Sequence, residues 1–155
     1  MAPAEPWAQR LRKARATSYV AGYRHDADSW SVVSSQSMPL LDEGDAIAAF
    51  AGSAQRLLSN PDPLVAETGR ESIELETTLG HERQGFVVSS INARQPGLSG
   101  TQIVAMWRRG SCIAFLALSG RKNTWAVSDL AALAARQDAR MVATLATWEP
   151  RPPIA

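Results

Sequence analysis

The sequence predicts an α+β fold, in which an antiparallel β-sheet of five to six strands is packed by two main helices within a single domain, residues 1–155. Three observations predict it. Runs rich in Val, Tyr, Trp, Ser and Thr alternate with short turn-forming stretches, which is typical of hairpin-connected strands. Two longer segments, 42–60 and 128–145, carry apolar residues at helical spacing. A chain of 155 residues with 45% hydrophobic and 20% charged residues can bury one core.

The first elements are a short helix and a pair of strands. Residues 6–16 predict a helix, because proline is well tolerated in a first turn and Trp7 and Leu11 are spaced four apart. Residues 17–24 and 30–38 predict two strands around the turn-forming HDADS. Pro39 ends the second strand or places it near an edge.

The segment 42–60 is the clearest helix. Asp42 is a favourable N-cap, and the sequence Asn60-Pro61 stops the helix. Its apolar stripe is expected to consist of Ile47, Phe50, Ala54, Leu57 and Leu58.

The middle of the chain shows weaker patterns of secondary structure than the segments on either side. Residues 72–79 (SIELETTL) alternate apolar and polar positions, which favours a half-exposed strand, with a short helix around 64–75 as the alternative. Residues 85–93 predict a strand, and 94–100 a loop.

Residues 101–120 predict a hairpin with a type II′ turn at Gly110-Ser111, which pairs Arg109 with Cys112 and Trp107 with Ala114. Both faces of this hairpin are apolar, so its strands are central and need cover on both sides. The helices 42–58 and 128–145 are expected to cover one face. The other face is then left for a ligand or a second subunit.

The last helix spans 128–145, with Ser128 as its expected N-cap. Its apolar stripe contains Leu130, Leu133, Met141 and Leu145. Residues 147–155 follow as a Pro-rich C-terminal tail.

Composition and charge limit the classes of function. A net charge of +1 argues against a nucleic-acid partner. No stretch is apolar enough to span a membrane, and the N-terminus has no apolar signal region. The chain as written is therefore expected in the cytoplasm, or outside it if an export signal has been removed or the start is misplaced.

No motif for a cofactor, a metal or a catalytic set is recognisable, so none is expected. Cys112 lies in an apolar run and is expected to pack as a small hydrophobe. The group His25, Asp26 and Asp28 is interpreted as a solvated turn. The patch Glu74, Glu76, His81 and Glu82 is interpreted as a wet surface.

The best candidates for ligand binding are Trp107, Arg108 and Arg109. An indole beside guanidinium groups can stack a flat or sugar-like ligand and hold an anion. The alternative is structural, with the tryptophan in the core and the arginines fringing the hairpin tip.

Three stretches carry a family resemblance: TQIVAMWRRGSCIAFLALSG (101–120), SDLAALAARQDARM (128–141) and LLDEGDAIAAFAGSAQRLL (40–58). With their surroundings they cover 19–58 and 101–141, and this half of the chain resembles actinobacterial sensor-type domains. Such domains occur in small lipoproteins and in the extracellular regions of mycobacterial Ser/Thr kinases. The resemblance implies a non-enzymatic α+β domain with a ligand groove. The chain differs in lacking a lipobox cysteine and the paired cysteines of the kinase sensors.

Three functions follow as hypotheses. The first is a non-catalytic, sensor-like domain that binds an unknown small ligand or protein partner. The second is a homodimeric protein-interaction module. The third is a small pocket enzyme of the α+β barrel type that uses His25 or His81, although the sequence favours a domain without catalysis.

Overall fold

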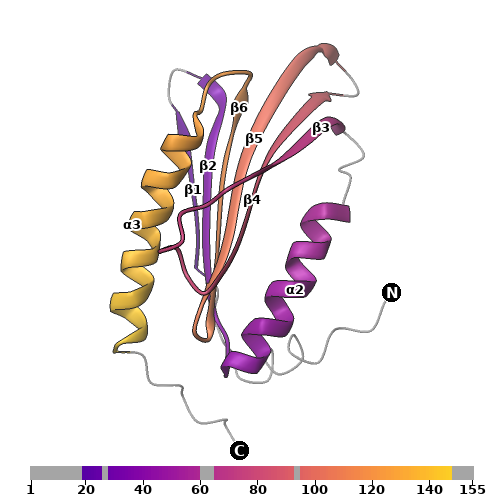
Figure 1. The fold of residues 1–155 in the computed structure, drawn as a ribbon. Coiled ribbons are helices and arrows are strands. Elements are labelled where there is room, and N and C mark those ends of the chain that lie inside the picture. Colours follow the sequence, from indigo (N-terminus) through magenta and orange to yellow (C-terminus); the bar gives the residue numbers. More distant parts are fainter. Residues whose placement is uncertain (1–18, 26–27, 60–64, 93–94, 148–155) are drawn as a thin grey trace, which may run out of the picture.

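The predicted hairpin lies at the centre of the sheet. The computed structural model describes residues 19–25, 28–59, 65–92 and 95–147. Strands β5 (Gln95–Arg109) and β6 (Cys112–Arg121) belong to a six-stranded sheet of order β1-β2-β6-β5-β4-β3, in which every neighbouring pair is antiparallel (Figure 1). The remaining strands are β1 (Tyr19–His25), β2 (Asp28–Pro39), β3 (Val65–Ile73) and β4 (Glu82–Asn92). The predicted α+β class is confirmed.

The turn of the hairpin has the backbone conformation that the sequence predicts. Gly110 has φ of +56°, whereas Ser111 is not among the positive-φ residues. A type I′ turn requires positive φ at both positions, so the backbone agrees with the type II′ prediction. Arg109 pairs with Cys112 and Trp107 with Ala114, which confirms the predicted register.

The connection before β4 differs from the predicted strand. The strand covers 65–73, and residues 74–79 form a turn, so neither the strand at 72–79 nor a helix at 64–75 is present. The alternation at 72–79 does not reflect a β-pleat: the turn buries only Leu75 and Leu79, which are four residues apart, and Thr77 between them is exposed. Residues 95–100 belong to β5 and not to a loop, and Gln95, Ser99 and Gly100 pair with β4, with a register shift between Ile91 and Asn92.

The two helices lie on opposite faces of the sheet (Figure 1). Helix α3 (Val127–Leu145) packs against the face that carries Trp107, and α2 (Glu43–Ser59) packs against the face that carries Met106. The expectation that both helices share one face and leave the other open is wrong. Two apolar faces are possible in one hairpin because each face has its own helix.

Helix α2 begins where the sequence indicates, but its buried stripe is rotated. The Asp42 side chain accepts a hydrogen bond of 2.7 Å from the Asp45 backbone N–H. Ile47 is 46% exposed, and the buried positions are instead the small residues Ala46 and Ala49, together with the predicted Phe50 and Ala54. The predicted Leu57 and Leu58 side chains lie outside the described part of the chain.

Helix α3 has its predicted stripe but a different cap. Leu130 and Met141 are buried, and Leu133 and Leu145 pack partly against the core. Ala126 is the N-cap, not Ser128, and its N–H donates to the Asp129 carboxylate over 2.8 Å. No helix within the described ranges is long and apolar enough to cross a membrane. The expected helix at 6–16 and the tail beyond Thr147 lie outside the described residues.

Candidate ligand-binding groove along helix α3

A groove of about 210 Å³ runs between helix α3 and the turn at 74–79. Its floor is a row of small side chains on one helix face, and its wall is the turn. The row extends from Val127 to Ala139, about 18 Å at 1.5 Å per helical residue. We call this site the α3 groove. Its lining residues are Glu74, Leu75, Glu76, Thr78, Leu79, Val127, Ala131, Ala134, Ala135, Asp138 and Ala139.

Two arginines hold the wall of the α3 groove in place. Arg83 donates to the carbonyl oxygens of Leu75 and Thr77 over 3.3 and 3.4 Å. Arg109 donates to the carbonyl oxygen of Thr78 over 2.8 Å. These bonds satisfy main-chain acceptors that a turn cannot pair internally, so the wall has a defined position relative to α3.

One end of the groove contains a hydrogen-bonded cluster around Asp138, which is 8% exposed. The indole nitrogen of Trp107 donates to its Oδ1 over 2.9 Å, and Arg109 Nε donates to the same atom over 2.8 Å. A second bond joins Arg109 Nη2 to Oδ2, so the ion pair is bidentate. The hydrogen bonds that Arg109 donates to Asp138 raise the pKa of Arg109 against the opposing effect of burial.

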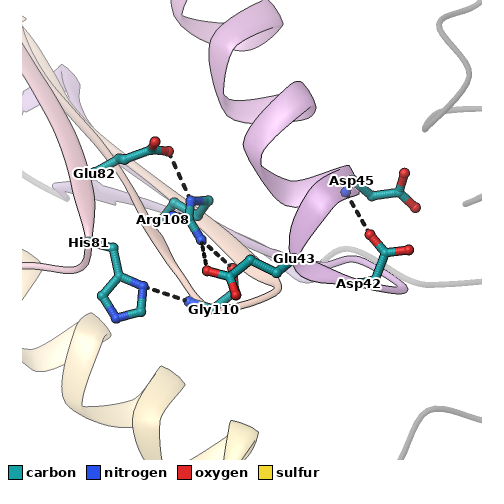
Figure 2. Close-up of polar contacts among 7 residues, drawn as sticks. All are labelled: Asp42, Glu43, Asp45, His81, Glu82, Arg108 and Gly110. Atoms are coloured by element: carbon teal, nitrogen blue, oxygen red, sulfur yellow. Dashed lines mark hydrogen bonds and ion pairs between the residues drawn. The ribbon is translucent and has the colours of Figure 1, made fainter.

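The opposite face of the sheet carries Arg108 (Figure 2). This side chain is 6% exposed and donates to Glu43 at the start of α2 over 2.8 Å and to Glu82 at the start of β4 over 2.9 Å. Burial acts to lower the pKa of Arg108, but the hydrogen bonds that Arg108 donates to the two carboxylates outweigh it and raise the pKa. The structure therefore brings Trp107 and Arg109 together and separates Arg108 from them.

All three predicted ligand-binding residues have intramolecular partners. Trp107 is completely buried, and its one polar atom is occupied by Asp138. Arg109 contributes to the groove through the carbonyl oxygen and carboxylate that it holds. Direct contact of these three side chains with a ligand stays a prediction.

The predicted acidic patch around His81 is divided between two places. Glu74 and Glu76 are exposed on the wall of the α3 groove, as expected for a wet surface, whereas Glu82 pairs with Arg108. His81 is exposed beside the hairpin turn, and its Nδ1 lies 3.4 Å from the Gly110 N–H, which donates to it (Figure 2). Within the described ranges, no group of three or more acidic, His or Cys residues is arranged to hold a metal ion.

The pocket-enzyme hypothesis named two histidines, His25 and His81, and the structure describes the side chain of only one of them. His81 does not belong to the lining of the α3 groove. The side chain of His25 and the adjacent Asp26 lie outside the described part of the chain. A catalytic role for His25 or His81 stays a prediction.

Cys112 is buried and 4% exposed beneath helix α3. Burial raises the pKa of its thiol to about 11. The thiol is therefore neutral near neutral pH and packs as a small apolar group, as the sequence indicates.

Sequence reasoning missed the groove itself. The visible signal was the recurrence of alanine at positions 131, 135 and 139, which leaves one helix face without bulk. The sequence did not indicate the wall of the groove, because the pattern of residues 74–79 predicts part of a strand and not a turn that packs beside α3. Asp138 was overlooked because a single carboxylate in a helix gives no sign that it will meet an indole and a guanidinium.

No known family matches the chain, and no curated protein matches it. Among solved structures, the chain is similar to a crystal structure of a Pseudomonas aeruginosa protein of unknown function with a suggested role as a regulator. The identity is 15%, the match covers 88% of this chain and 85% of that one, and the TM-score is 0.37. A likeness of this degree does not bear on function.

Proposed function

We propose that the chain is a non-catalytic, sensor-like domain that binds a small ligand in the α3 groove. The observation that carries the proposal is the groove itself, an apolar hollow beside two exposed carboxylates, with a wall held by three arginine–carbonyl hydrogen bonds. Ligand sites in proteins are typically concave and mostly apolar, with a few polar groups that fix the orientation of the ligand.

The lining indicates the chemistry of the ligand. Alanine methyl groups and the two leucines suit a narrow aliphatic body, and its burial supplies the main favourable term, about 25 cal/mol per Å² of apolar surface. Glu74 and Glu76 at the rim favour a positively charged head group. Because exposed ion pairs contribute only about 0–1 kcal/mol each, the charge sets preference more than affinity.

The sensor aspect rests on the resemblance of residues 19–58 and 101–141 to actinobacterial sensor-type domains. A ligand in the α3 groove would contact the last helix and the connection between β3 and β4 at once. Binding would stabilise the arrangement in which the two are held together, which is the requirement for a ligand-dependent response.

The test compares three probes with the same aliphatic body: hexylamine, hexanol and hexanoate. Methyl NMR spectra of protein labelled at alanine report whether each probe reaches Ala131, Ala135 and Ala139. We expect hexylamine to shift these signals most, hexanol with about two- to five-fold weaker affinity, and hexanoate least. Equal affinities of all three would remove the role of the rim carboxylates.

Matched variants locate the site. Ala135→Phe fills the groove from an exposed position, and Ala143→Phe adds the same ring at an exposed position of α3 outside the lining. We expect the first variant to abolish the alanine shifts and the second to leave them unchanged. No saturable shift with any probe, or retention of the shifts in Ala135→Phe, would overturn the proposal.

A further inference from the structure

The two edge strands of the sheet are protected to different degrees. Strands β1 and β3 are the edges, and no described strand pairs with the outer side of either. An exposed edge presents unpaired N–H and C=O groups, which can pair with another chain. Natural proteins block such edges with bulges and charges, so an unblocked edge indicates a place where pairing is tolerated or used.

Strand β3 carries both kinds of protection. Its pairing with β4 shifts register between Glu67 and Gly69, which breaks the regular edge. Glu67 and Arg70 form an ion pair of 2.6 Å, and Glu71 adds a further exposed charge. A second strand could not add to β3 without disrupting these features.

Over most of its length, strand β1 has neither a break in its pairing nor a charged residue. Residues 19–23 (YVAGY) are uncharged, and two tyrosines and a valine favour the extended state. The strand pairs with β2 without interruption from Tyr19 to Arg24, and the only irregularity comes after Arg24. Its outer edge is therefore regular where it is uncharged.

We propose that β1 pairs antiparallel with β1 of a second copy of this chain, so that two six-stranded sheets become one continuous sheet. A two-fold axis at Ala21 sets Tyr19 opposite Tyr23 and does not place the two Arg24 residues opposite each other. Such a contact is self-complementary and closes as a dimer. Pairing of β1 with β3 would instead propagate as an open fibre, which the bulge and charges of β3 prevent.

The dimer is independent of the ligand-binding proposal, because β1 contributes no residue to the α3 groove. Sedimentation velocity over a concentration series measures the dimer directly. We expect a reversible monomer–dimer equilibrium in the micromolar range. A monomer up to the highest soluble concentration overturns the proposal and leaves the groove untouched.

Variants at the axis test the surface. Ala21→Lys sets two like charges opposite each other and should raise the dimer dissociation constant about five-fold or more, whereas Ala21→Ser should not. Circular dichroism establishes that both variants fold. If they do not, the cross-linking experiment decides.

Cross-linking uses Ala21→Cys in a Cys112→Ala background, because residues paired across the axis come within disulfide reach. We expect mild oxidation to give a covalent dimer, and Gly69→Cys on β3 in the same background to stay monomeric. A dimer that resists Ala21→Lys and is not cross-linked at position 21 uses another surface, and the proposal is then wrong. If β1 instead pairs with a strand of a different protein, this chain alone stays monomeric in these measurements, and the proposal is also wrong.

Discussion

Arg108 and Arg109 are neighbours in the sequence, yet they hold opposite helices by different means. Arg109 is paired with a carboxylate on α3 that is itself buried, and the indole of Trp107 shares that carboxylate. Arg108 is the more buried guanidinium, but its partners Glu43 and Glu82 have side chains that are 59% and 41% exposed.

The comparison indicates that the burial of the carboxylate, more than that of the guanidinium, decides how much stability is lost when the ion pair is broken. Removing a buried carboxylate leaves buried donors without an acceptor, which is costly. Removing an exposed carboxylate leaves a guanidinium that still has a second carboxylate and the carbonyl oxygen of Gly110. The α3 face should therefore be sensitive to substitution and the α2 face tolerant.

The largest effect is expected at Asp138. Asp138→Ala leaves the buried indole N–H without its acceptor and leaves Arg109 with only the carbonyl oxygen of Thr78, and should lower the free energy of unfolding by about 3 kcal/mol. Asp138→Asn keeps an acceptor oxygen and should lower it by less. Urea unfolding followed by tryptophan fluorescence measures both. A loss below about 1 kcal/mol for the alanine variant would show that the two faces do not differ.

The pH dependence of stability reports on Cys112, also on the α3 face. Its pKa rises from 9.0 to about 11, so the folded state holds the thiol proton more tightly than the unfolded chain. The stabilisation is complete below pH 9 and is lost as the pH rises through about 11, an effect of about 2–3 kcal/mol. Cys112→Ala should have a shallower decline over this range in urea unfolding. Equal slopes would contradict the prediction.

A pair of glycines tests the wall of the α3 groove. A Cβ at Gly85 would lie 2.7 Å from Cγ1 of Ile73 and 3.0 Å from Cδ2 of Leu75, whereas a Cβ at Gly69 would meet nothing within 4 Å. Gly85→Ala should destabilise the protein by about 2 kcal/mol and weaken hexylamine binding, because Leu75 lines the groove. Gly69→Ala should do neither. Thermal unfolding and the alanine methyl signals measure the two effects.

The tolerant face is tested by Glu43→Gln. Because this carboxylate is exposed and Glu82 remains, the loss in unfolding free energy should be about 0–1 kcal/mol. A loss comparable with that of Asp138→Ala would mean that burial of the guanidinium, and not of the carboxylate, decides the outcome.

The smallest effect is expected at Ile47, which is 46% exposed on α2. Ile47→Lys should change the free energy of unfolding by no more than about 0.5 kcal/mol. Ala46→Lys is the matched variant, since Ala46 is completely buried, and it should destabilise strongly. Similar effects at the two positions would contradict the assigned face of the helix.

The sequence predicted local features well and the relation between distant ones poorly. The turn at Gly110 and the pairing of Arg109 with Cys112 follow from adjacent residues, and both are confirmed. The side of the sheet on which α2 lies depends on contacts across the whole chain, which no local pattern specifies. The stripe of α2 was misplaced because alanines 46 and 49 carry a weak apolar signal beside Ile47.

The same limit applies to the candidate site. The alternation at 72–79 predicted a strand, but the turn at 74–79 buries only Leu75 and Leu79, four residues apart, and leaves Thr77 exposed. The charged, bulged strand at 65–73 gave no alternation, because an edge strand needs few apolar residues. The α3 groove combines that turn with a helix some 50 residues away, a proximity that only the tertiary structure provides.

The tip of the hairpin also distinguishes the correct alignment of its strands from incorrect ones. If β5 slipped by one residue against β6, the apolar positions would still meet apolar positions, and hydrophobicity alone would not reject the error. Trp107 and Arg109 would then turn toward α2 and away from Asp138, while Arg108 would turn away from Glu43. Two adjacent arginines with partners on different helices thus make misalignment costly, and a chain with two apolar faces keeps one register.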